Sequence, residues 1–483
     1  MADSPIIVWF RNDLRLSDNP ALDAAVERGG PIIPIYIWSP DEEADWQLGG
    51  ASKVWLHYSL QSLNEALEAS NSRLLIRSGQ SLPIIQEMIQ ETNAQAVYWN
   101  RRYEPYSIQR DSIVKSELKK QNIDAKSFNG SLLFEPWEIQ TKQEQPYKVF
   151  TPFWKTCTSL PEPDEPTSAA HKIQSIKHWP KSQKLETLNL LPKIQWHNGI
   201  LNSWSIGEAA AKKQLRHFIS EAMSEYSVGR DIPGKPLTSR MSPYLHFGEI
   251  SPRQIWHEVV FALSNNDTGN DSTSAWAFLR EVGWREFAYH LMYHFPHTTT
   301  DPLREKFSRF PWKSNPRFLQ AWQKGETGLP IIDAGMRELW ATGWMHNRVR
   351  MVVASLLVKN MLVPWQEGAR WFWDTLVDAD LASNTFGWQW TAGCGADAAP
   401  FFRIFNPIAQ GEKFDGDGEY VRKWVPEINN LPDKWIHKPW EAPATILNDA
   451  GVTLGKNYPY PVVDLKITRQ DALEAYQTLK RMK

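Results

Sequence analysis

The amino-acid sequence predicts an α/β domain built on a doubly wound parallel sheet, followed by a large all-α domain. The first 130 residues alternate short apolar runs with amphipathic segments, whereas residues 204–483 carry one amphipathic segment after another. A chain of 483 residues is also too long for one ordinary hydrophobic core. We therefore expect domains at 1–130 and 204–483, joined by a connector at 131–203.

The apolar runs of the first domain are typical of buried strands, because they are apolar on both faces and end at turn residues. They lie at 6–10, 32–38, 74–76 and 96–99. Helices are expected between them: one beginning near Asn19 and Pro20, one following Ser52, and others over 84–91 and 108–120. This alternation predicts a parallel, Rossmann-like sheet.

The connector is rich in Pro, Lys, Ser and Gln, most densely at 160–166, which favours a long connection over a packed element. The second domain opens with a candidate capping box at Ser205 and Glu208. Helices are then expected over 206–224, 252–263, 275–293, 332–340, 347–362, 368–376 and 467–481.

Several common kinds of site are not indicated. Residues 10–15 follow the first strand where a dehydrogenase would have a glycine-rich phosphate loop, and no Walker A loop or G-x-S-x-G serine motif occurs. The glycine pattern at 393–398 lies far from the sheet and is interpreted as chance. His290, His294 and His297 lack the carboxylate of a zinc motif, so we expect no metal.

Cysteine content and charge narrow the class of protein further. Cys157 and Cys394 are far apart, which argues against a disulfide scaffold, and no segment has the length and apolarity of a membrane span. We expect a cytoplasmic protein with no membrane partner. Because the net charge is −2, any binding of nucleic acid requires a local basic patch, with candidates at Arg230, Arg348, Arg403, Lys413, Arg422 and Lys423.

Tryptophan is unusually abundant and concentrated. The chain has 25 tryptophans, and 15 of them fall between Trp256 and Trp440. Residues 344–390 combine many indoles with carboxylates and amides, each of which needs a partner once it is buried. Since tryptophan is also readily oxidised, this segment suggests a redox or photochemical site.

Within this segment, helical spacing places Asn347, Arg350 and Met351 on one face. Asp378 and Asp380 follow, and either could pair with that arginine or accept hydrogen bonds from a ligand. A buried ion pair between Arg350 and Asp378 is the structural alternative. Trp388 and Trp390 are two residues apart and therefore point in roughly opposite directions, one inward and the other toward a cavity.

Several separate motifs resemble the DNA photolyase and cryptochrome family, in the family's order and over essentially the whole chain. They lie at 10–19, 237–243, 284–287, 343–348 and 402–407. The chain looks most like a class III cyclobutane pyrimidine dimer photolyase, the branch related to plant cryptochromes. The resemblance implies an antenna-chromophore domain, a long connector and a helical domain that holds FAD.

Position by position, the resemblance also implies the flavin contacts. Residues matching the phosphate and ribose contacts are Tyr226, Thr238, Ser239, Arg240, Met241 and Ser242. Residues matching the surroundings of the isoalloxazine are Arg285, Trp344, Asn347, Arg350, Asp378, Asp380 and Asn384. Asn384 resembles the residue beside flavin N5, where an amide is the photolyase pattern and favours the fully reduced anionic flavin.

On the substrate side, the chain is similar to enzymes that repair cyclobutane dimers. Positions matching lesion contacts are Glu281, Trp284, Asn347, Met351 and Trp390, and those expected to hold the DNA backbone are Arg230, Arg348, Arg403 and Gln410. Asn347 stands where enzymes for (6-4) photoproducts have histidine, so that substrate is disfavoured. The expected partner is dimer-containing damaged DNA, bound by a monomer.

Trp312, Trp365 and Trp388 match the family's chain of tryptophans for photoreduction of the flavin. The resemblance implies a lyase in which excited FADH⁻ gives an electron to the dimer, the ring splits and the electron returns. Glu104 matches an acidic antenna contact. The antenna is expected to be methenyltetrahydrofolate, with 8-hydroxy-5-deazaflavin as the alternative.

Two other functions compete with repair. A cryptochrome-like blue-light photoreceptor without repair activity is the first alternative; the repair-site residues and the absence of a long polar tail speak against it. A light-independent flavoprotein oxidoreductase is the second, but the sequence offers no nicotinamide-binding loop. Loss of Glu281, Trp284 and Trp390 should abolish repair and spare signalling.

Overall fold

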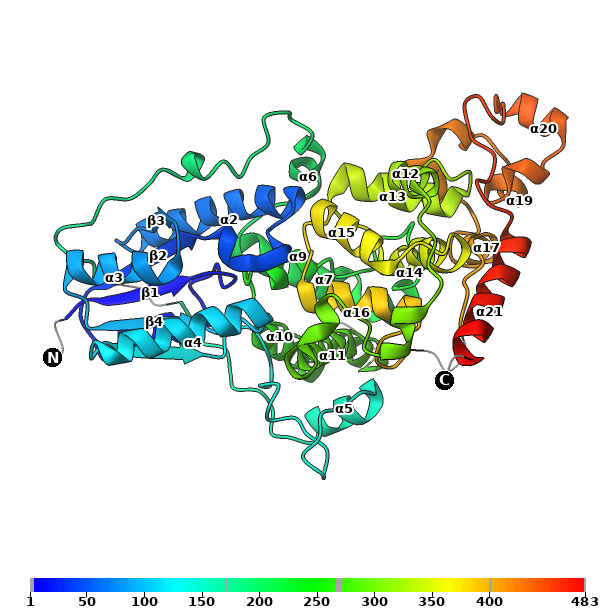
Figure 1. Ribbon diagram of the computed structural model, residues 1–483. Helices are drawn as coiled ribbons and strands as arrows, with labels where there is room; N and C mark the ends of the chain where they lie inside the picture. Colours follow the sequence, from blue (N-terminus) through cyan, green and yellow to red (C-terminus); the bar gives the residue numbers. More distant parts are fainter. Residues whose placement is uncertain (1–3, 170–172, 266–271, 399–401, 482–483) are drawn as a thin grey trace. The chain divides into compact units, whose positions relative to one another are not determined.

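The computed structural model describes residues 4–169, 173–265, 272–398 and 402–481 (Figure 1). By their contacts these residues form two compact units that interleave along the chain. Unit 1 comprises Met1–His197, Trp204–Ser224 and Ser239–Pro296, and unit 2 comprises Asn198–Ser203, Glu225–Thr238 and His297–Lys483. The domain boundaries at 130 and 203 stay a prediction.

Unit 1 contains the expected parallel sheet, with strand order β3-β2-β1-β4-β5. The strands are β1 (Ile6–Phe10), β2 (Ile32–Trp38), β3 (Leu75–Ser78), β4 (Ala96–Asn100) and β5 (Asp124–Phe128). The apolar runs thus correctly predicted the first four strands, to within two residues. No apolar run marks β5, an edge strand in which only Ala125 is fully buried.

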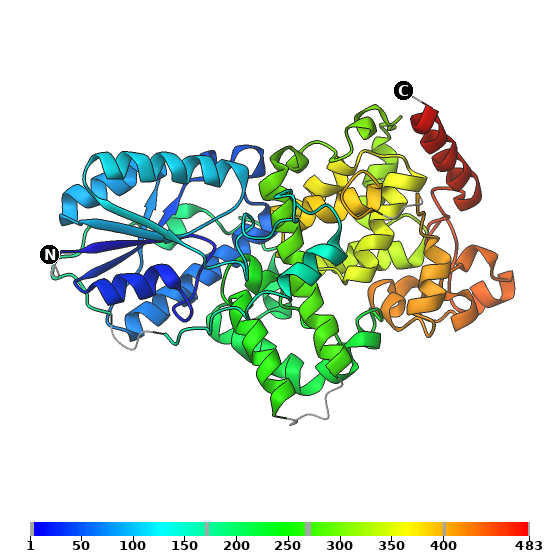
Figure 2. The same ribbon diagram turned by 90° about the horizontal axis from the view of Figure 1, so that it is seen from below.

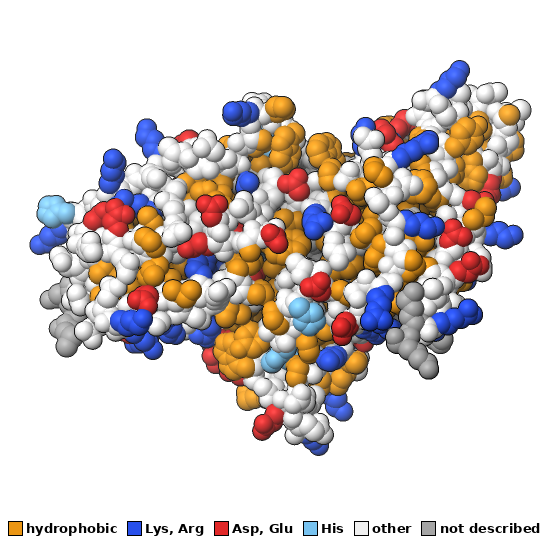
Figure 3. Space-filling model, viewed as in Figure 1, with side chains coloured by type: hydrophobic (Ala, Val, Ile, Leu, Met, Phe, Trp, Pro, Cys, Tyr) orange, Lys and Arg blue, Asp and Glu red, His pale blue; other side chains and the backbone are white. Residues whose placement is uncertain are grey.

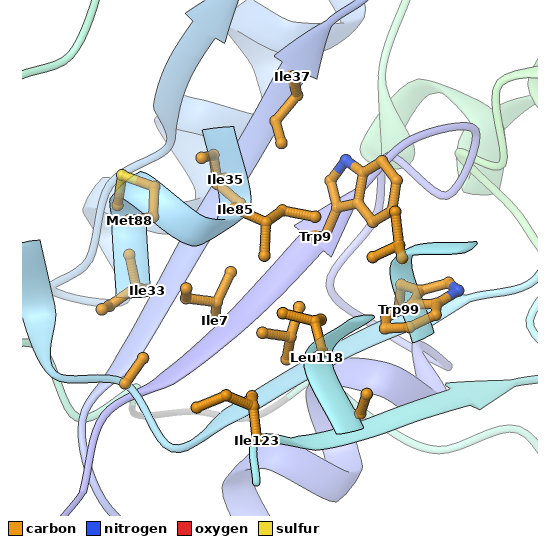
Figure 4. Close-up of a cluster of buried hydrophobic side chains, with 14 of the residues drawn as sticks. Ile7, Trp9, Ile33, Ile35, Ile37, Ile85, Met88, Trp99, Leu118 and Ile123 are labelled. Atoms are coloured by element: carbon orange, nitrogen blue, oxygen red, sulfur yellow. The ribbon is translucent and has the colours of Figure 1, made fainter. Parts of the chain in front are cut away.

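Helices cover both faces of this sheet. Ile7, Trp9, Ile33 and Ile35 project from one face into a core that they share with α3 and α4 (Figure 4). Figure 2 shows the sheet between these two helices and the dark blue α1 and α2. The bounds are α1 (Pro20–Arg28), α2 (Gly50–Ala69), α3 (Ser81–Thr92) and α4 (Pro105–Lys120).

The remaining regular structure of unit 1, among its described residues, is helical. It contains α5 (Phe150–Cys157), α7 (Glu208–Glu221), α9 (Ser242–His246), α10 (Pro252–Ser264) and α11 (Ser272–His294). The predicted capping box at Ser205 was wrong: Gly207 is the N-cap of α7, and Glu208 instead accepts hydrogen bonds from Leu16 and Ser17. A capping box does form at Ser251 and Gln254, at the start of α10.

Unit 2 is helical, and apart from one isolated bridge its described residues contain no strand. Its first helices are α6 (Asn198–Ser203), α8 (Tyr226–Gly229), α12 (Pro316–Lys324), α13 (Pro330–Thr342), α14 (Asn347–Ser355), α15 (Trp365–Thr375) and α16 (Leu381–Ala392). It ends with α17 (Pro407–Phe414), α18 (Glu419–Trp424), α19 (Asp433–Ile436), α20 (Ala444–Asp449) and α21 (Leu465–Arg481). The predicted helix over 347–362 is α14 continued by a π-helical turn at Leu356–Asn360.

Candidate functional site

Arg350 and Asp378 form an ion pair between α14 and the loop that precedes α16. Two guanidinium–carboxylate distances of 2.8 and 3.1 Å join them, and Arg350 Nε donates to the Met345 carbonyl at 2.7 Å. The Asp378 side chain is only 2% exposed, whereas that of Arg350 is 24% exposed. The buried Asp378 carboxylate is therefore neutralised by Arg350, in the ion pair that the sequence analysis gave as the structural alternative. Part of the Arg350 side chain remains exposed.

Asn384 has an amide whose orientation follows from its partner. Its Nδ2 donates to the Ala369 carbonyl of α15 at 3.0 Å, and a carbonyl can only accept. The amide oxygen must then point elsewhere, and among the described residues no donor reaches it. One turn earlier, Asp380 caps α16 by accepting from Ser383 N at 2.7 Å. This end of α16 thus combines carboxylate and amide acceptors.

Trp388 lies on α16 against α15. It is 2% exposed, its ring packs on Gly368, and the centroid of Phe372 is 5.0 Å away. Its Nε1 is buried and finds no acceptor among the described residues. Trp390 is half-buried, as expected for a residue on a different side of the same helix.

The other tryptophans of the expected chain also belong to unit 2. Trp365 is the first residue of α15 and is 1% exposed. Trp312 is half-buried, and its ring centroid is 4.4 Å from that of Phe310. A passage of charge through these three indoles stays a prediction.

The start of α14 brings together residues that the sequence placed on one helix face. Asn347 is the exposed first residue of the helix, Met351 is half-buried, and the Arg350 guanidinium lies 6.0 Å from the ring of Trp344. Trp344 is also half-buried. These residues form one edge of the candidate site in unit 2.

His346 is a residue to which the sequence analysis gave no role. It caps α14, because its Nδ1 accepts from Arg348 N at 3.2 Å, and its buried Nε2 has no partner among the described residues. The pKa of His346 is lowered to about 4, mainly by burial; Asp231 opposes this shift, and the charges of Arg350 and Arg348 add to it. The sequence signal was a histidine directly before a helix start.

The expected DNA-backbone residues of unit 2 are held in different ways. Arg348 pairs with Asp231 at 2.6 Å and stacks 4.4 Å from the ring of Phe414. Arg403 is exposed and lies 5.5 Å from the ring of Phe405. The half-buried Arg230 lies over Tyr226, and Gln410 is half-buried on α17.

In unit 1, α11 carries three of the predicted residues. Glu281, Trp284 and Arg285 are all half-buried. Arg285 donates to the Ser131 carbonyl at 2.8 Å, so it also ties the connector to α11. The next residue, Glu286, is buried and accepts from Leu133 N at 2.8 Å; burial raises its pKa to about 7, although Arg285 opposes the shift.

The predicted phosphate-contact segment is divided between the units. Tyr226, which is 7% exposed, and the half-buried Thr238 belong to unit 2, whereas residues 239–242 belong to unit 1. Arg240 has a φ of 54°, Met241 is 2% exposed and Ser242 is exposed at the start of α9. The Ser239 carbonyl accepts from Gln214 at 3.0 Å.

Glu104, the expected antenna contact, is engaged within the protein. Both its carboxylate oxygens bind Arg102, at 3.1 Å each, and Arg102 also pairs with Glu43 at 2.8 Å. Burial alone would raise the pKa of Glu104, but the charge and hydrogen bonds of Arg102 outweigh it and hold that pKa below its usual value. An antenna contact at Glu104 would compete with this ion pair.

Neither a membrane span nor a metal cluster occurs among the residues that the structure describes. Within them, no helix is both long and apolar enough to cross a membrane. They also hold no cluster of three His, Cys, Asp or Glu side chains suited to a metal ion. His290 and His294 both contact the Pro136 carbonyl.

Comparison with known families decides which family this is. Residues 6–170 match the DNA photolyase family, and residues 278–478 match the FAD binding domain of DNA photolyase. The chain belongs to the DNA photolyase family. The second match supports FAD as the cofactor of this photolyase-family protein. The candidate site in unit 2 has donors and acceptors that suit a flavin ring, which carries both N–H and carbonyl groups. The Arg350 guanidinium can donate, and the Asp380 carboxylate and the Asn384 amide oxygen, which is left free to accept because Nδ2 donates to Ala369, can accept.

Individual relatives agree with this assignment. The chain is 50% identical to a deoxyribodipyrimidine photo-lyase of Agrobacterium fabrum, over 99% of this chain and 98% of the relative. It is 41% identical to Cryptochrome-1 of Arabidopsis thaliana, over 95% of this chain and 68% of the relative. A crystal structure of a class III photolyase from Agrobacterium tumefaciens superposes with a TM-score of 0.96 at 49% identity, covering 100% of this chain and 99% of that one.

Proposed function

We propose that this photolyase-family protein is a deoxyribodipyrimidine photo-lyase that repairs cyclobutane pyrimidine dimers in DNA with light. The observation that carries the proposal is the direction of the Asn384 amide, whose oxygen is left as an acceptor. An acceptor beside flavin N5 favours the protonated nitrogen of the reduced flavin, which is the form that dimer repair requires. Half of the residues are shared with the Agrobacterium fabrum photo-lyase, which supports the same activity.

FAD is proposed to be held by the residues that match the family's contacts. Arg350 would donate to the isoalloxazine with the part of its guanidinium that Asp378 leaves exposed. Asp380 would accept from a ring N–H, as would the oxygen of Asn384. Tyr226, Arg285 and residues 238–242 would contribute the remaining contacts.

Reduced FAD, when bound, would supply the electron that opens the cyclobutane ring under blue or near-ultraviolet light and would take it back afterwards, with no net redox change. Trp284 and Trp390 would stack on a dimer that has left the duplex, and Glu281 would hydrogen-bond its polar edge. Asn347 and Met351 match further lesion contacts of the family and are proposed to contact the dimer as well.

The DNA backbone is proposed to contact Arg230, Arg348, Arg403 and Gln410. Such contacts position the protein and read no sequence. Because Asp231 already pairs with Arg348 at 2.6 Å, a phosphate would have to share or replace that partner. Arg403 is exposed and more readily reached.

Trp388, Trp365 and Trp312 are proposed to return electrons to a flavin that has become oxidised. Trp388 would donate first, since it lies on the same helix as Asn384, one turn further on. For the antenna we propose methenyltetrahydrofolate, with 8-hydroxy-5-deazaflavin as the alternative. The ion pair of Glu104 with Arg102 makes a simple acidic contact there less favourable.

A cryptochrome-like photoreceptor is the second candidate function. The observation in its favour is the 41% identity to Cryptochrome-1 of Arabidopsis thaliana. A photoreceptor would bind and photoreduce the same flavin, so flavin spectra alone do not separate the two functions. An assay of dimer repair separates them.

The test is illumination of the reduced holoprotein with a dimer-containing single-stranded oligonucleotide, followed by the recovery of thymine absorbance against a dark control. We expect light-dependent recovery in the wild type. At subsaturating DNA, Glu281→Ala with Trp390→Ala should slow it by at least about 30-fold, if the pair contributes ~2 kcal/mol or more. Trp276→Ala, at an exposed indole of α11, is the control and should repair normally. Absence of recovery in the wild type would favour the photoreceptor.

A further inference from the structure

Phe150 stacks face to face on Trp284. The two ring centroids are 3.6 Å apart and the ring planes differ by 10°. Phe150 is the first residue of α5, in the connector, whereas Trp284 lies on α11; both belong to unit 1. The connector helix therefore supplies a ring that covers one face of a proposed lesion contact.

Phe150 is itself firmly placed. It is fully buried, its ring meets Phe287 edge-on at 5.8 Å, and the Arg280 guanidinium lies 5.2 Å from its centroid. One turn further along α5, Trp154 packs so closely on Gly283 that an added Cβ would come within 2.4 Å of its ring. The close helix–helix contact at Gly283 thus sets the position from which Phe150 reaches Trp284.

The approach to α5 is also fixed to α11. Tyr147 N donates to His290 Nε2 at 3.0 Å, and the Tyr147 hydroxyl lies 2.7 Å from that of Thr156. Phe153, on the same helix, packs against Phe287 and His290 with centroid distances of 5.1 Å. Because of these contacts α5 is packed against α11, although the composition of residues 131–203 around it is typical of a linker.

We propose that Phe150 is a positioning residue that holds the Trp284 indole in the plane in which it receives the pyrimidine dimer. The inference rests on the proposed function, because it takes Trp284 as a lesion contact. Phe150 closes one face of the Trp284 ring to a planar ligand. The connector helix α5 thus determines which face of this indole is barred to the lesion.

The test measures the dissociation constant of the holoprotein for a dimer-containing oligonucleotide. Phe150→Leu should raise it about 2- to 13-fold, the change that corresponds to the ~0.5–1.5 kcal/mol of a stacked aromatic pair. Phe150→Tyr, which keeps the ring face, should stay within about 2-fold of the wild type on the same scale. Phe153→Leu is the matched control: it removes a buried ring from α5 but leaves Phe150 on Trp284, and its affinity should change little.

A double-mutant cycle separates positioning from general stability. In a Trp284→Leu background, Phe150→Leu should weaken binding no further, because the ring that it orients is gone. A loss that is the same in both backgrounds, or equal losses in Phe150→Leu and Phe153→Leu, would overturn the inference. If Phe150→Leu does not fold, Phe150→Met fills the space without a flat face and is judged by the same criteria.

Failure of this inference is distinguishable from failure of the proposed function. If Trp284→Leu alone binds the dimer as tightly as the wild type, Trp284 is no lesion contact, and both the inference and that part of the proposed function are wrong. If Trp284→Leu weakens binding but Phe150→Leu does not, only the positioning role is wrong.

Discussion

Asn384 and His346 are both oriented by backbone groups that allow one direction of hydrogen bonding. The Ala369 carbonyl accepts only from the amide nitrogen of Asn384, and the Arg348 N–H donates only to an unprotonated His346 nitrogen. The first arrangement leaves an acceptor in the proposed flavin site. The second means that protonation of His346 would remove the cap of α14, the helix that carries Arg350.

His346 should therefore make the protein less stable in acid. The pKa of His346 is about 4 in the folded protein, against 6.5 for an unperturbed histidine. Between those values the unfolded chain binds more protons, so the free energy of unfolding falls as pH decreases, by up to about 3 kcal/mol across the window. His346→Asn keeps a helix-capping side chain that does not titrate. Thermal unfolding at pH 7.5 and 5 should show a smaller acid loss in this variant than in the wild type.

His297, which is exposed, provides the control for the acid series. The acid loss of His346→Asn is compared with that of His297→Asn, which leaves the cap of α14 in place. If His346→Asn loses as much stability in acid as the wild type does, the neutral cap at α14 has no part in acid stability.

At the scale of elements, α15 and α16 meet where Gly368 faces Trp388. A Cβ added at Gly368 would lie 2.0 Å from the Trp388 ring, so the absence of a side chain is what admits the indole. The same two helices are joined by Asn384 and the Ala369 carbonyl. Their close contact thus positions both an expected electron donor and the expected partner of flavin N5.

Gly368→Ala should disturb this contact. Overpacking a buried contact costs about 1–3 kcal/mol, and the displaced Trp388 ring should also slow light-driven reduction of the oxidised flavin. Gly387→Ala on α16 is the matched control, since nothing lies within 4 Å of its added Cβ. That substitution should raise the unfolding temperature, because alanine favours helix over glycine. Equal photoreduction rates in both variants would argue against Trp388 as the first donor.

Much of the fold could be predicted from the sequence, because its strands are buried on both faces. The edge strand β5 could not, since its residues are mostly polar and only pairing with β4 makes it a strand. The predicted capping box at Ser205 was wrong for another reason. The Glu208 carboxylate accepts hydrogen bonds from the backbone N–H groups of Leu16 and Ser17, which are far away in the sequence. Local patterns do not contain such long-range contacts.

Helix α5 was not predicted, although its signal is present in the sequence. Phe150, Phe153, Trp154 and Cys157 have the i, i+3, i+4, i+7 spacing of an amphipathic helix, but the prolines around them favoured a linker. In the candidate site, the Arg350–Asp378 pair was foreseen as a structural alternative. The direction of the Asn384 amide was not, because it depends on a carbonyl of a different helix.

At the scale of the whole molecule, charge is balanced. The net charge is −2, and on the face shown in Figure 3 basic and acidic side chains are interspersed. We therefore expect recognition of DNA to depend on a few local cations together with the proposed stacking on the lesion, and not on a general attraction to phosphate. Such a protein is expected to favour damaged over intact DNA through the contacts to the dimer.

The central claim is light-driven repair without net oxidation of the flavin, and counting turnovers tests it most directly. The reduced holoprotein is illuminated without oxygen or added reductant in the presence of excess dimer-containing oligonucleotide, and dimers and flavin spectrum are followed together. We predict that many dimers are split per flavin, that the flavin stays reduced, and that a dark sample splits none. Unchanged dimers in the light, or one dimer split for each flavin oxidised, would contradict the account.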